Sequence, residues 1–192
     1  MPKQLKLSDI RIELKFNKNN GLSVFSIRDL VEHPEEYRID FDVFLETKGK
    51  NLQRPFVWTL LQKQELILSM LKGIALPAIC IIQNSKVESD KRRDRVYEVI
   101  DGKQRLSTIL AFVKGEFNIE VNGKEYNITQ LEEPARRLII NHYVKADVAY
   151  SYTYANGSKE AFITDEEKIA WFEMINFAGT PQDIEHLIDL KS

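Results

Sequence analysis

The chain has 192 residues, of which 43% are hydrophobic, with 27 Lys and Arg against 29 Asp and Glu. A chain of this length and apolar content can bury a core without crosslinks, so disordered and fibrous classes are excluded, and we expect one domain over residues 1–192. The charge is uneven: residues 48–105 carry twelve basic and six acidic side chains, whereas residues 164–192 carry two and seven. The middle of the chain is therefore basic and its end is acidic.

Cysteine usage and hydropathy define the expected cellular setting. Cys80 is the only cysteine, so no internal disulfide can form, which is typical of a reducing cytoplasm. The apolar runs are far shorter than the roughly 20 residues that span a bilayer, and the N-terminus lacks the apolar core of a secretory signal. We expect a cytoplasmic protein with no membrane partner.

Hydrophobic periodicity and turn signals predict helices and strands in a mixed order, which indicates an α+β (mixed α/β) fold. Thr59 with Gln62 and Thr164 with Glu167 form capping boxes, and Asn122-Gly123 is a strong hairpin signal. In chain order, we expect an irregular segment over residues 1–25, a helix over 26–31, a strand over 39–45 and a helix over 59–72. Strands over 78–83 and 96–100 follow, joined by a charged hairpin loop, and then a helix after Gly102 and a hairpin over 117–128. The last expected elements are a helix over 131–143, a strand over 144–152, a helix over 164–177 and a helix opening at Thr180-Pro181.

The most informative segment is VIDGKQR at residues 99–105, where a buried strand ends in a glycine turn and continues into a helix. Backbone N–H groups and the positive end of the helix dipole meet there, and such a point suits a phosphate. Gly102 permits a close approach, Arg105 offers a planar fork for phosphate oxygens, Gln104 can orient water, and Asp101 can hold a metal or a base. The alternative is an ordinary Asp-Gly turn with Arg105 facing solvent.

A second informative segment is QRPFVW at residues 53–58, within the basic part of the chain. Arg54 beside Phe56 and Trp58 can bind an anionic ligand under aromatic cover, or stack on a base. The alternative is a hydrophobic staple, in which the two aromatic residues pack at the start of the following helix and Arg54 forms a surface ion pair.

Other residues with chemical potential have simpler explanations. The histidines are scattered at His33, His142 and His186, which does not fit a nuclease that binds its metal through paired histidines. Lys91-Arg92-Arg93 can touch DNA, but neighbouring acidic residues favour a solvated loop. The stripe formed by Tyr150, Tyr152 and Tyr154 is either a base-stacking face or, more typically, sheet core.

Three motifs in one order carry a resemblance to a known family. QRPFVW at residues 53–58, YEVIDGKQRLST at 97–108 and FEMINFAGTP at 172–181 resemble the QR-x-[FY]-x-W, DGQQR and F-x-x-[IL]-N-x-x-G-T-P elements of the N-terminal domain of GmrSD-type modification-dependent restriction systems. The resemblance covers most of the chain. It implies a fold similar to ParB and sulfiredoxin domains, with a small mixed sheet flanked by helices and extra C-terminal helices, in which the DGQQR turn handles nucleoside-triphosphate phosphates.

The resemblance also assigns roles to individual residues. Asp101, Gln104 and Arg105 are expected to be catalytic, with Asp101 as a candidate ligand of Mg²⁺. The expected phosphate-binding residues are Gln53, Arg54, Gly102, Lys103, Arg105 and Asn176. Lys103 stands where the family has a glutamine, so it adds a charge that strengthens phosphate binding but lacks the amide that could orient water. Cys80, in the apolar run AICII, is expected to be buried and inert, unlike the nucleophile of a sulfiredoxin.

The expected function is that of a nucleoside-triphosphate-binding and hydrolysing module of a prokaryotic or phage restriction or defence system that acts on or senses DNA. Such proteins often have a separate C-terminal nuclease domain, so a nuclease subunit or a further nuclease domain is the expected partner, besides nucleotide and DNA. One alternative is a non-catalytic DNA-binding or adaptor module that recruits a nuclease. Another is that the motifs only stabilise the fold.

Overall fold

The structure is a computed structural model, and it describes residues 21–87, 93–154, 156–160 and 162–177. Its strands are β1 (Gly21–Ser26), β2 (Arg38–Asp40), β3 (Phe44–Leu45), β4 (Lys50–Asn51), β5 (Ile79–Val87), β6 (Arg93–Asp101), β7 (Ile119–Val121), β8 (Lys124–Tyr126), β9 (Tyr143–Tyr154) and β10 (Lys159–Glu160). Its α-helices are α2 (Ile27–Glu32), α3 (Leu60–Leu71), α4 (Lys103–Val113), α5 (Glu133–Ile140) and α6 (Asp165–Phe177), with a short 3-10 helix at Ile128–Gln130.

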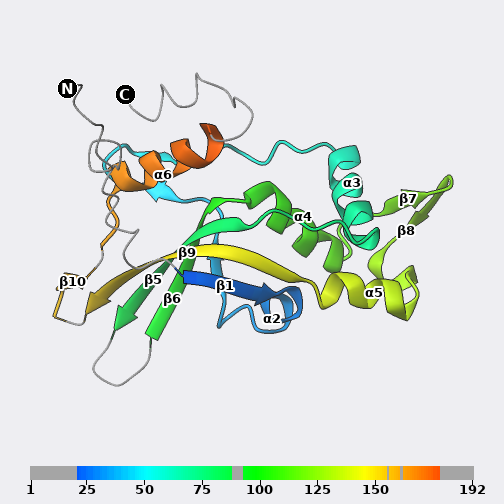
Figure 1. Ribbon diagram of the computed structural model, residues 1–192, viewed down its shortest axis with the longest axis horizontal. Helices are drawn as coiled ribbons and strands as arrows, with labels where there is room; N and C mark the ends of the chain where they lie inside the picture. Colours follow the sequence, from blue (N-terminus) through cyan, green and yellow to red (C-terminus); the bar gives the residue numbers. More distant parts are fainter. Residues whose placement is uncertain (1–20, 88–92, 155, 161, 178–192) are drawn as a thin grey trace, which may run out of the picture.

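A mixed sheet forms the centre of the molecule, with the strand order β1-β9-β5-β6-β2 and β10 paired along β9 (Figure 1). β9 runs parallel to β5, and β6 runs parallel to β2, whereas β5 and β6 form an antiparallel hairpin. Two small hairpins, β3-β4 and β7-β8, lie outside this sheet. The predicted α+β class with a mixed sheet is confirmed.

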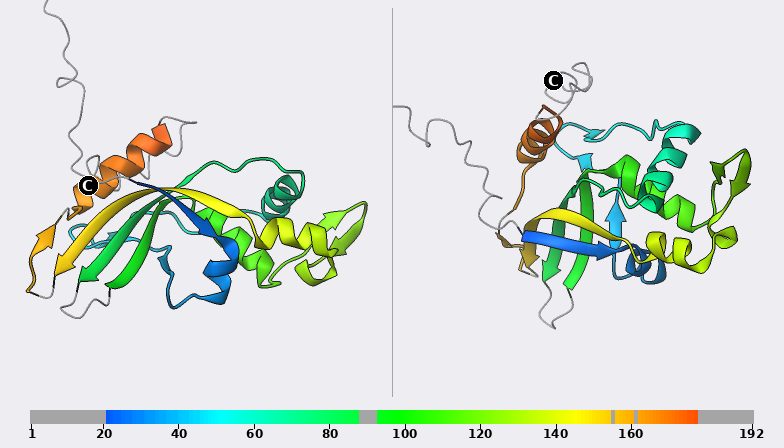
Figure 2. Two further views of the ribbon diagram at one scale, coloured as in Figure 1. Left: turned by 60° about the horizontal axis from the view of Figure 1, so that its bottom comes forward. Right: turned by 45° about the vertical axis from the view of Figure 1, so that its right-hand side comes forward.

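Each face of the sheet covers its own apolar core, because successive side chains of a strand point to opposite faces. Ile79 and Ile81 of β5 belong to a core that also contains residues of α2, α3, α4 and α5. Cys80 and Ile82 belong to a second core with residues of α6. Figure 2 shows α6 on one side of the sheet and α2 on the other. The predicted burial of Trp171 and of the Cys80 thiol is confirmed.

The prediction of an irregular segment over residues 1–25 is wrong for its last five residues, which belong to β1. This strand pairs with β9 in the register Gly21↔Val148 to Ser26↔Tyr143. Its formation depends on a partner more than 100 residues away, which local periodicity does not reveal. The Ser26 cap of the following helix is confirmed, since its hydroxyl accepts a hydrogen bond from the Asp29 backbone N–H at 3.5 Å.

The strand predicted over residues 39–45 is interrupted rather than continuous. It is divided into β2 and β3, and the Asp42 backbone N–H donates to the Asp40 side chain at 2.9 Å in the interruption. Aspartate side chains compete in this way with strand hydrogen bonds. The β5-β6 hairpin is confirmed, although its strands extend into the charged segment as far as the Val87↔Arg93 pair.

The remaining predictions agree with the structure at the level of elements. The capping boxes of α3 and α6 are both present, Pro134 lies in the first turn of α5, and Asn122-Gly123 joins β7 to β8. The helix predicted from Thr180-Pro181 lies outside the described residues. The finer likeness to ParB and sulfiredoxin domains stays a prediction. Within the described ranges, none of the helices has the length and apolarity required to cross a membrane.

Candidate functional site

The candidate site lies where β6 ends and α4 begins. Gly102 is the N-cap residue of α4 and has a left-handed backbone conformation, with φ of 101°. It supplies no side-chain cap to the N–H groups of the first helical turn. The positive end of the helix dipole and uncapped N–H donors therefore coincide at this turn, as the sequence predicted.

The glycine at this turn also has a structural cause that is independent of any ligand. A Cβ atom added to Gly102 would lie 2.3 Å from Cγ2 and 2.8 Å from Cβ of Ile79, the first residue of β5. No side chain fits in that space, and the positive φ is unfavourable for other residues as well. Close packing of the turn against β5 therefore requires glycine here.

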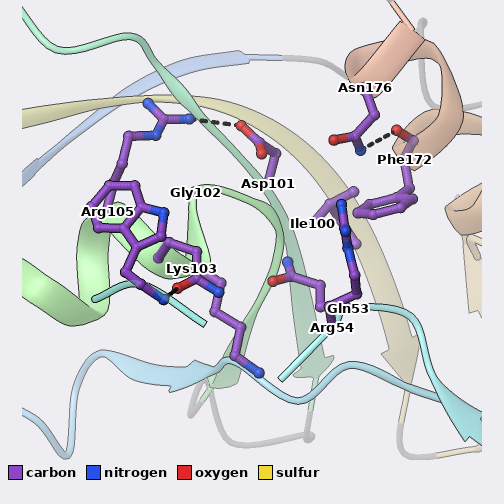
Figure 3. A pocket seen from close by; sticks show the side chains of 11 residues that line it. Gln53, Arg54, Ile100, Asp101, Gly102, Lys103, Arg105, Phe172 and Asn176 are labelled. Atoms are coloured by element: carbon purple, nitrogen blue, oxygen red, sulfur yellow. Dashed lines mark hydrogen bonds and ion pairs between the residues drawn. The ribbon is translucent and has the colours of Figure 1, made fainter. Parts of the chain in front are cut away.

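A cavity of about 180 Å³ opens beside this turn (Figure 3). Every residue that the sequence assigned to the site lies in the lining of this cavity. The two motifs, separated by more than 40 residues in the chain, lie together in space. The lining residues are Gln53, Arg54, Trp58, Ile100, Asp101, Gly102, Lys103, Gln104, Arg105, Phe172 and Asn176. The structure thus brings together residues from the β4-α3 loop, the β6-α4 turn and α6.

Arg105 is bonded to protein groups on one side of the cavity. Its Nη2 donates to Oδ2 of Asp101 at 2.7 Å, and its Nη1 donates to the carbonyl oxygen of Pro77 at 2.5 Å. Both terminal nitrogens also lie 3.3 Å from the carbonyl oxygen of Ala78. The Asp101–Arg105 ion pair therefore joins the end of β6 to α4, and the bonds to Pro77 and Ala78 join α4 to the segment before β5. A phosphate contact by Arg105 would compete with these bonds.

Gln104 connects the two motifs through the backbone of the β4-α3 loop. Its side-chain oxygen accepts from the N–H groups of Val57 and Trp58, both at 3.3 Å. Its amide nitrogen donates to the carbonyl oxygen of Pro55, also at 3.3 Å. In this arrangement, Gln104 holds the loop that carries Arg54 against the start of α4.

Two further polar side chains of the site, Gln53 and Lys103, are bonded to other groups of the protein. Gln53, which is buried, donates from its amide to the carbonyl oxygen of Val99. Lys103 is also buried, and its Nζ lies 2.6 Å from Oδ1 of Asp42, whose side chain is 70% exposed. The charge expected to contact phosphate at Lys103 is therefore paired with an exposed carboxylate at the surface.

Arg54 and Asn176 form the side of the cavity opposite Arg105 in Figure 3. Arg54 is half-buried, and Asn176 lies in the last turn of α6. Asn176 donates from Nδ2 to the carbonyl oxygen of Phe172 at 2.7 Å. This bond to its own helix fixes the amide at the wall of the cavity.

Sequence reasoning missed some residues of the site. Trp58 and Phe172 line the cavity; both lie in motifs that the sequence analysis singled out, but neither was among the residues assigned to catalysis or phosphate binding. The partner of Lys103, Asp42, carried no signal except its position in an alternating segment. Phe56 is 37% exposed with the Lys63 ammonium 4.6 Å from its ring centre, so it covers the surface of the α3 start rather than the cavity.

The electrostatics of the cavity favour an anion. Its lining includes three basic residues, Arg54, Lys103 and Arg105, and one acidic residue, Asp101, and one positive charge remains in excess when Asp42, the partner of Lys103, is counted as well. Burial raises the pKa of the nearby Cys80 thiol to about 12, and the charge of Asp101 contributes to this rise. The thiol is therefore neutral near pH 7 and unsuited to nucleophilic chemistry.

A metal ion at this site would depend largely on ligands other than protein side chains. Among the described residues, the one cluster of three metal-binding side chains is the exposed group of His33, Glu35 and Glu36, which lies outside the cavity. Asp101 supplies one carboxylate. Mg²⁺ is commonly held by one or two carboxylates together with water and substrate phosphates, so this donor set fits Mg²⁺ bound with a nucleotide.

Comparison with known proteins identifies the family. No significant match was found to a curated protein or to a solved structure. The family model described as "GmrSD restriction endonuclease, N-terminal domain" matches residues 47–188. This match includes both motifs and every residue that lines the cavity. The chain therefore belongs to the family of the GmrSD restriction endonuclease N-terminal domain.

Proposed function

We propose that this chain, which its family membership identifies as a component of a restriction or defence system, binds the phosphates of a nucleoside triphosphate in its cavity at Gly102. The observation that carries this proposal is the meeting of an uncapped helix N-terminus with a surplus of basic side chains in one cavity. Helix N-termini bind phosphate through their N–H groups and their dipole.

The dimensions of the cavity define which part of the nucleotide it holds. Its volume of about 180 Å³ is below the roughly 300–1,000 Å³ typical of pockets that enclose a small molecule. The cavity therefore accommodates phosphate groups, while the sugar and base lie outside or against its rim. Trp58 is half-buried at this cavity and provides an aromatic surface for such a contact.

Within this proposal the basic residues divide into two groups. Arg54 lies on the loop held by Gln104, so it is the guanidinium that we assign to the phosphates. Arg105 acts mainly as a positioning residue, since it bonds Asp101 and the carbonyl oxygens before β5. For hydrolysis, Asp101 would be a ligand of a Mg²⁺ ion bound with the nucleotide, and this ion would neutralise phosphate charge. Gln104 would orient a water once its bonds to the loop are released.

Nucleotide binding would then regulate action on DNA, with the nuclease activity in a further domain or a partner. The basic surplus of residues 48–105 supports attraction to polyanions in general. Nucleotide in the Gly102 cavity would hold the β4-α3 loop and the end of α6 together, because both contribute to its walls.

Calorimetric titration with nucleoside triphosphates and Mg²⁺ tests the proposal. The informative variant is Arg54→Ala, and its control is Lys72→Ala, an exposed lysine of the same basic segment that does not line the cavity. Charged hydrogen bonds contribute about 1.5–3 kcal/mol, so Arg54→Ala should weaken binding by roughly 10- to 150-fold, and the control by less than twofold. No binding by the wild type, or equal binding by Arg54→Ala, would reject the assignment.

A further inference from the structure

A second cavity lies on the α6 face of the sheet, away from the Gly102 turn. Its volume is about 320 Å³, which is within the range of small-molecule sites. Its walls come from β3, β5, β6, β9, β10 and the first turn of α6. None of its residues lines the Gly102 cavity.

The floor of this cavity is polar although it is built on the central sheet. Ser151 of β9 is 3% exposed, and Asn84 is its neighbour across the β5-β9 pairing. Both residues lie on the face that carries apolar Ile82 and Ala149 nearer the Gly102 turn. Polar groups replace apolar ones along the same strands, so this end of the sheet offers hydrogen bonds to a bound molecule.

A buried ion pair stands beside these groups. The Lys168 ammonium lies 2.9 Å from one carboxylate oxygen of Glu98 and 3.1 Å from the other, and the two side chains are 11% and 15% exposed. Burial of a matched ion pair is costly unless the surrounding groups support it. The pair joins α6 to β6 and leaves the cavity with no local excess of charge.

The charge of the whole lining is balanced. Three lysines, Lys86, Lys159 and Lys168, face three acidic residues, Glu46, Glu98 and Asp165. Asp165 accepts hydrogen bonds from the backbone and side chain of Thr47 at 2.8 and 2.9 Å. The phosphates of a ligand gain little from such a surface, so this cavity favours an uncharged group, either as a free molecule or as part of a larger one.

Aromatic side chains lie at the edge of the cavity. Phe44 is 53% exposed and Phe162 is 44% exposed, and both contribute to the lining. The ammonium of Lys159 lies 3.7 Å from the centre of the Phe162 ring, which restrains the ring at this position. Exposed phenylalanine faces are a stacking surface for a flat ring.

We propose that this second cavity is a binding site for an uncharged nucleobase, with Phe162 stacking on the ring and Asn84 and Ser151 contacting its hydrogen-bonding edge. An amide offers a donor and an acceptor side by side, which matches the paired groups on a base edge. The base can belong to a free nucleoside or to a nucleic acid strand. This site is separate from the phosphate site, because the two cavities share no lining residue.

The test uses the full chain, labelled with ¹⁵N, and neutral nucleosides as probes. Adenosine, cytidine, thymidine and inosine are titrated in separate samples, and a short single-stranded oligonucleotide is titrated in another, while amide shifts are recorded. At least one probe should shift amides around Asn84 and Ser151 and leave those of Gly102 to Arg105 in place. Saturation by the nucleoside alone identifies a free nucleoside as the source, whereas saturation by the oligonucleotide alone identifies a strand.

Phe162→Ala is the informative variant, because its side chain is exposed and its loss does not open the core. Its matched control is Val121→Ala, an exposed apolar residue of the remote β7-β8 hairpin. Phe162→Ala should weaken binding at least fivefold, and the control less than twofold. Unchanged binding by Phe162→Ala, equal binding of myo-inositol, which is neutral but has no aromatic ring, or no shift with any probe would overturn the proposal. Inorganic tripolyphosphate tests the Gly102 cavity separately, so either site can fail alone.

Discussion

The Gly102 cavity and the second cavity differ in the charge of their linings. The Gly102 cavity has three basic residues and one acidic residue around a helix N-terminus, whereas the second cavity has three of each sign around a buried ion pair. The first therefore attracts an anion over a distance, and the second selects by shape and hydrogen bonds. The near-zero net charge of the chain conceals this difference.

The two cavities also differ in what holds them together. At the Gly102 turn, backbone groups are fixed by Gln53, Gln104 and Arg105 through hydrogen bonds. In the second cavity, the central bond is one ion pair between a strand and a helix. Helix α6 is shared: Lys168 in its first turn contacts the second cavity, and Asn176 in its last turn contacts the first. Mutations can separate these contributions.

The largest effect is expected for Gly102→Ala. The new Cβ would collide with Ile79, and the residue would have to keep a positive φ, so the free energy of unfolding should fall by roughly 3–5 kcal/mol. The control is Gly49→Ala, which has φ of 66° but no atom within 4 Å of the added Cβ, and it should cost about 1 kcal/mol. Chemical denaturation measures both, and equal losses would show that the contact with Ile79 is unimportant.

The ion pair of the second cavity should give the next largest effect. Lys168→Met leaves Glu98 buried without its partner, and such a change typically costs about 3–5 kcal/mol. The double variant Glu98→Gln/Lys168→Met removes the charge on both sides and should recover part of that loss. Denaturation curves of the single and double variants provide the comparison. If the double variant is less stable than Lys168→Met, the pair is not the main interaction between α6 and β6.

The two cavities also differ in whether their positions could be predicted from the sequence. The Gly102 site could be predicted because its residues lie in three short contiguous motifs and because a strand, a glycine turn and a helix start have a fixed local geometry. The second cavity could not be predicted, since its lining residues come in small groups from six elements and the loops beside them. Their meeting depends on sheet register, such as Asn84 opposite Ser151, and on the docking of α6.

The roles of single residues inside the predicted site could not be predicted from the sequence either. Arg105 and Gln104 were expected to contact ligand, and the structure gives both of them partners within the protein. Hydrogen-bond partners such as the Pro77 carbonyl oxygen become visible only when the fold brings the start of β5 to the start of α4. A sequence motif therefore identifies where the site lies, and the fold determines which side chains of the motif can contact a ligand.

Ionic strength should distinguish the cavities by a moderate effect. Triphosphate binding at the Gly102 cavity should weaken by about three- to tenfold between low and physiological salt, because screening lowers the attraction between the basic side chains and the phosphates. Nucleoside binding at the balanced second cavity should change by less than about twofold. Titrations of both probes at several salt concentrations test this, and a parallel salt dependence would mean that both probes use one site.

The smallest effect is expected for Gln104, and it decides between two roles. If Gln104 mainly holds the β4-α3 loop, Gln104→Ala should lower the free energy of unfolding by about 1 kcal/mol and weaken triphosphate binding several-fold, because the loop carries Arg54. Gln104→Glu keeps an oxygen that can accept from the N–H groups of Val57 and Trp58 but loses the donor to the Pro55 carbonyl oxygen, so it should restore only part of the stability. Its added negative charge should still weaken triphosphate binding, because like charges repel. If instead Gln104→Ala leaves stability and affinity unchanged but abolishes nucleotide turnover, measured as phosphate release, the side chain serves to orient water rather than to hold the loop.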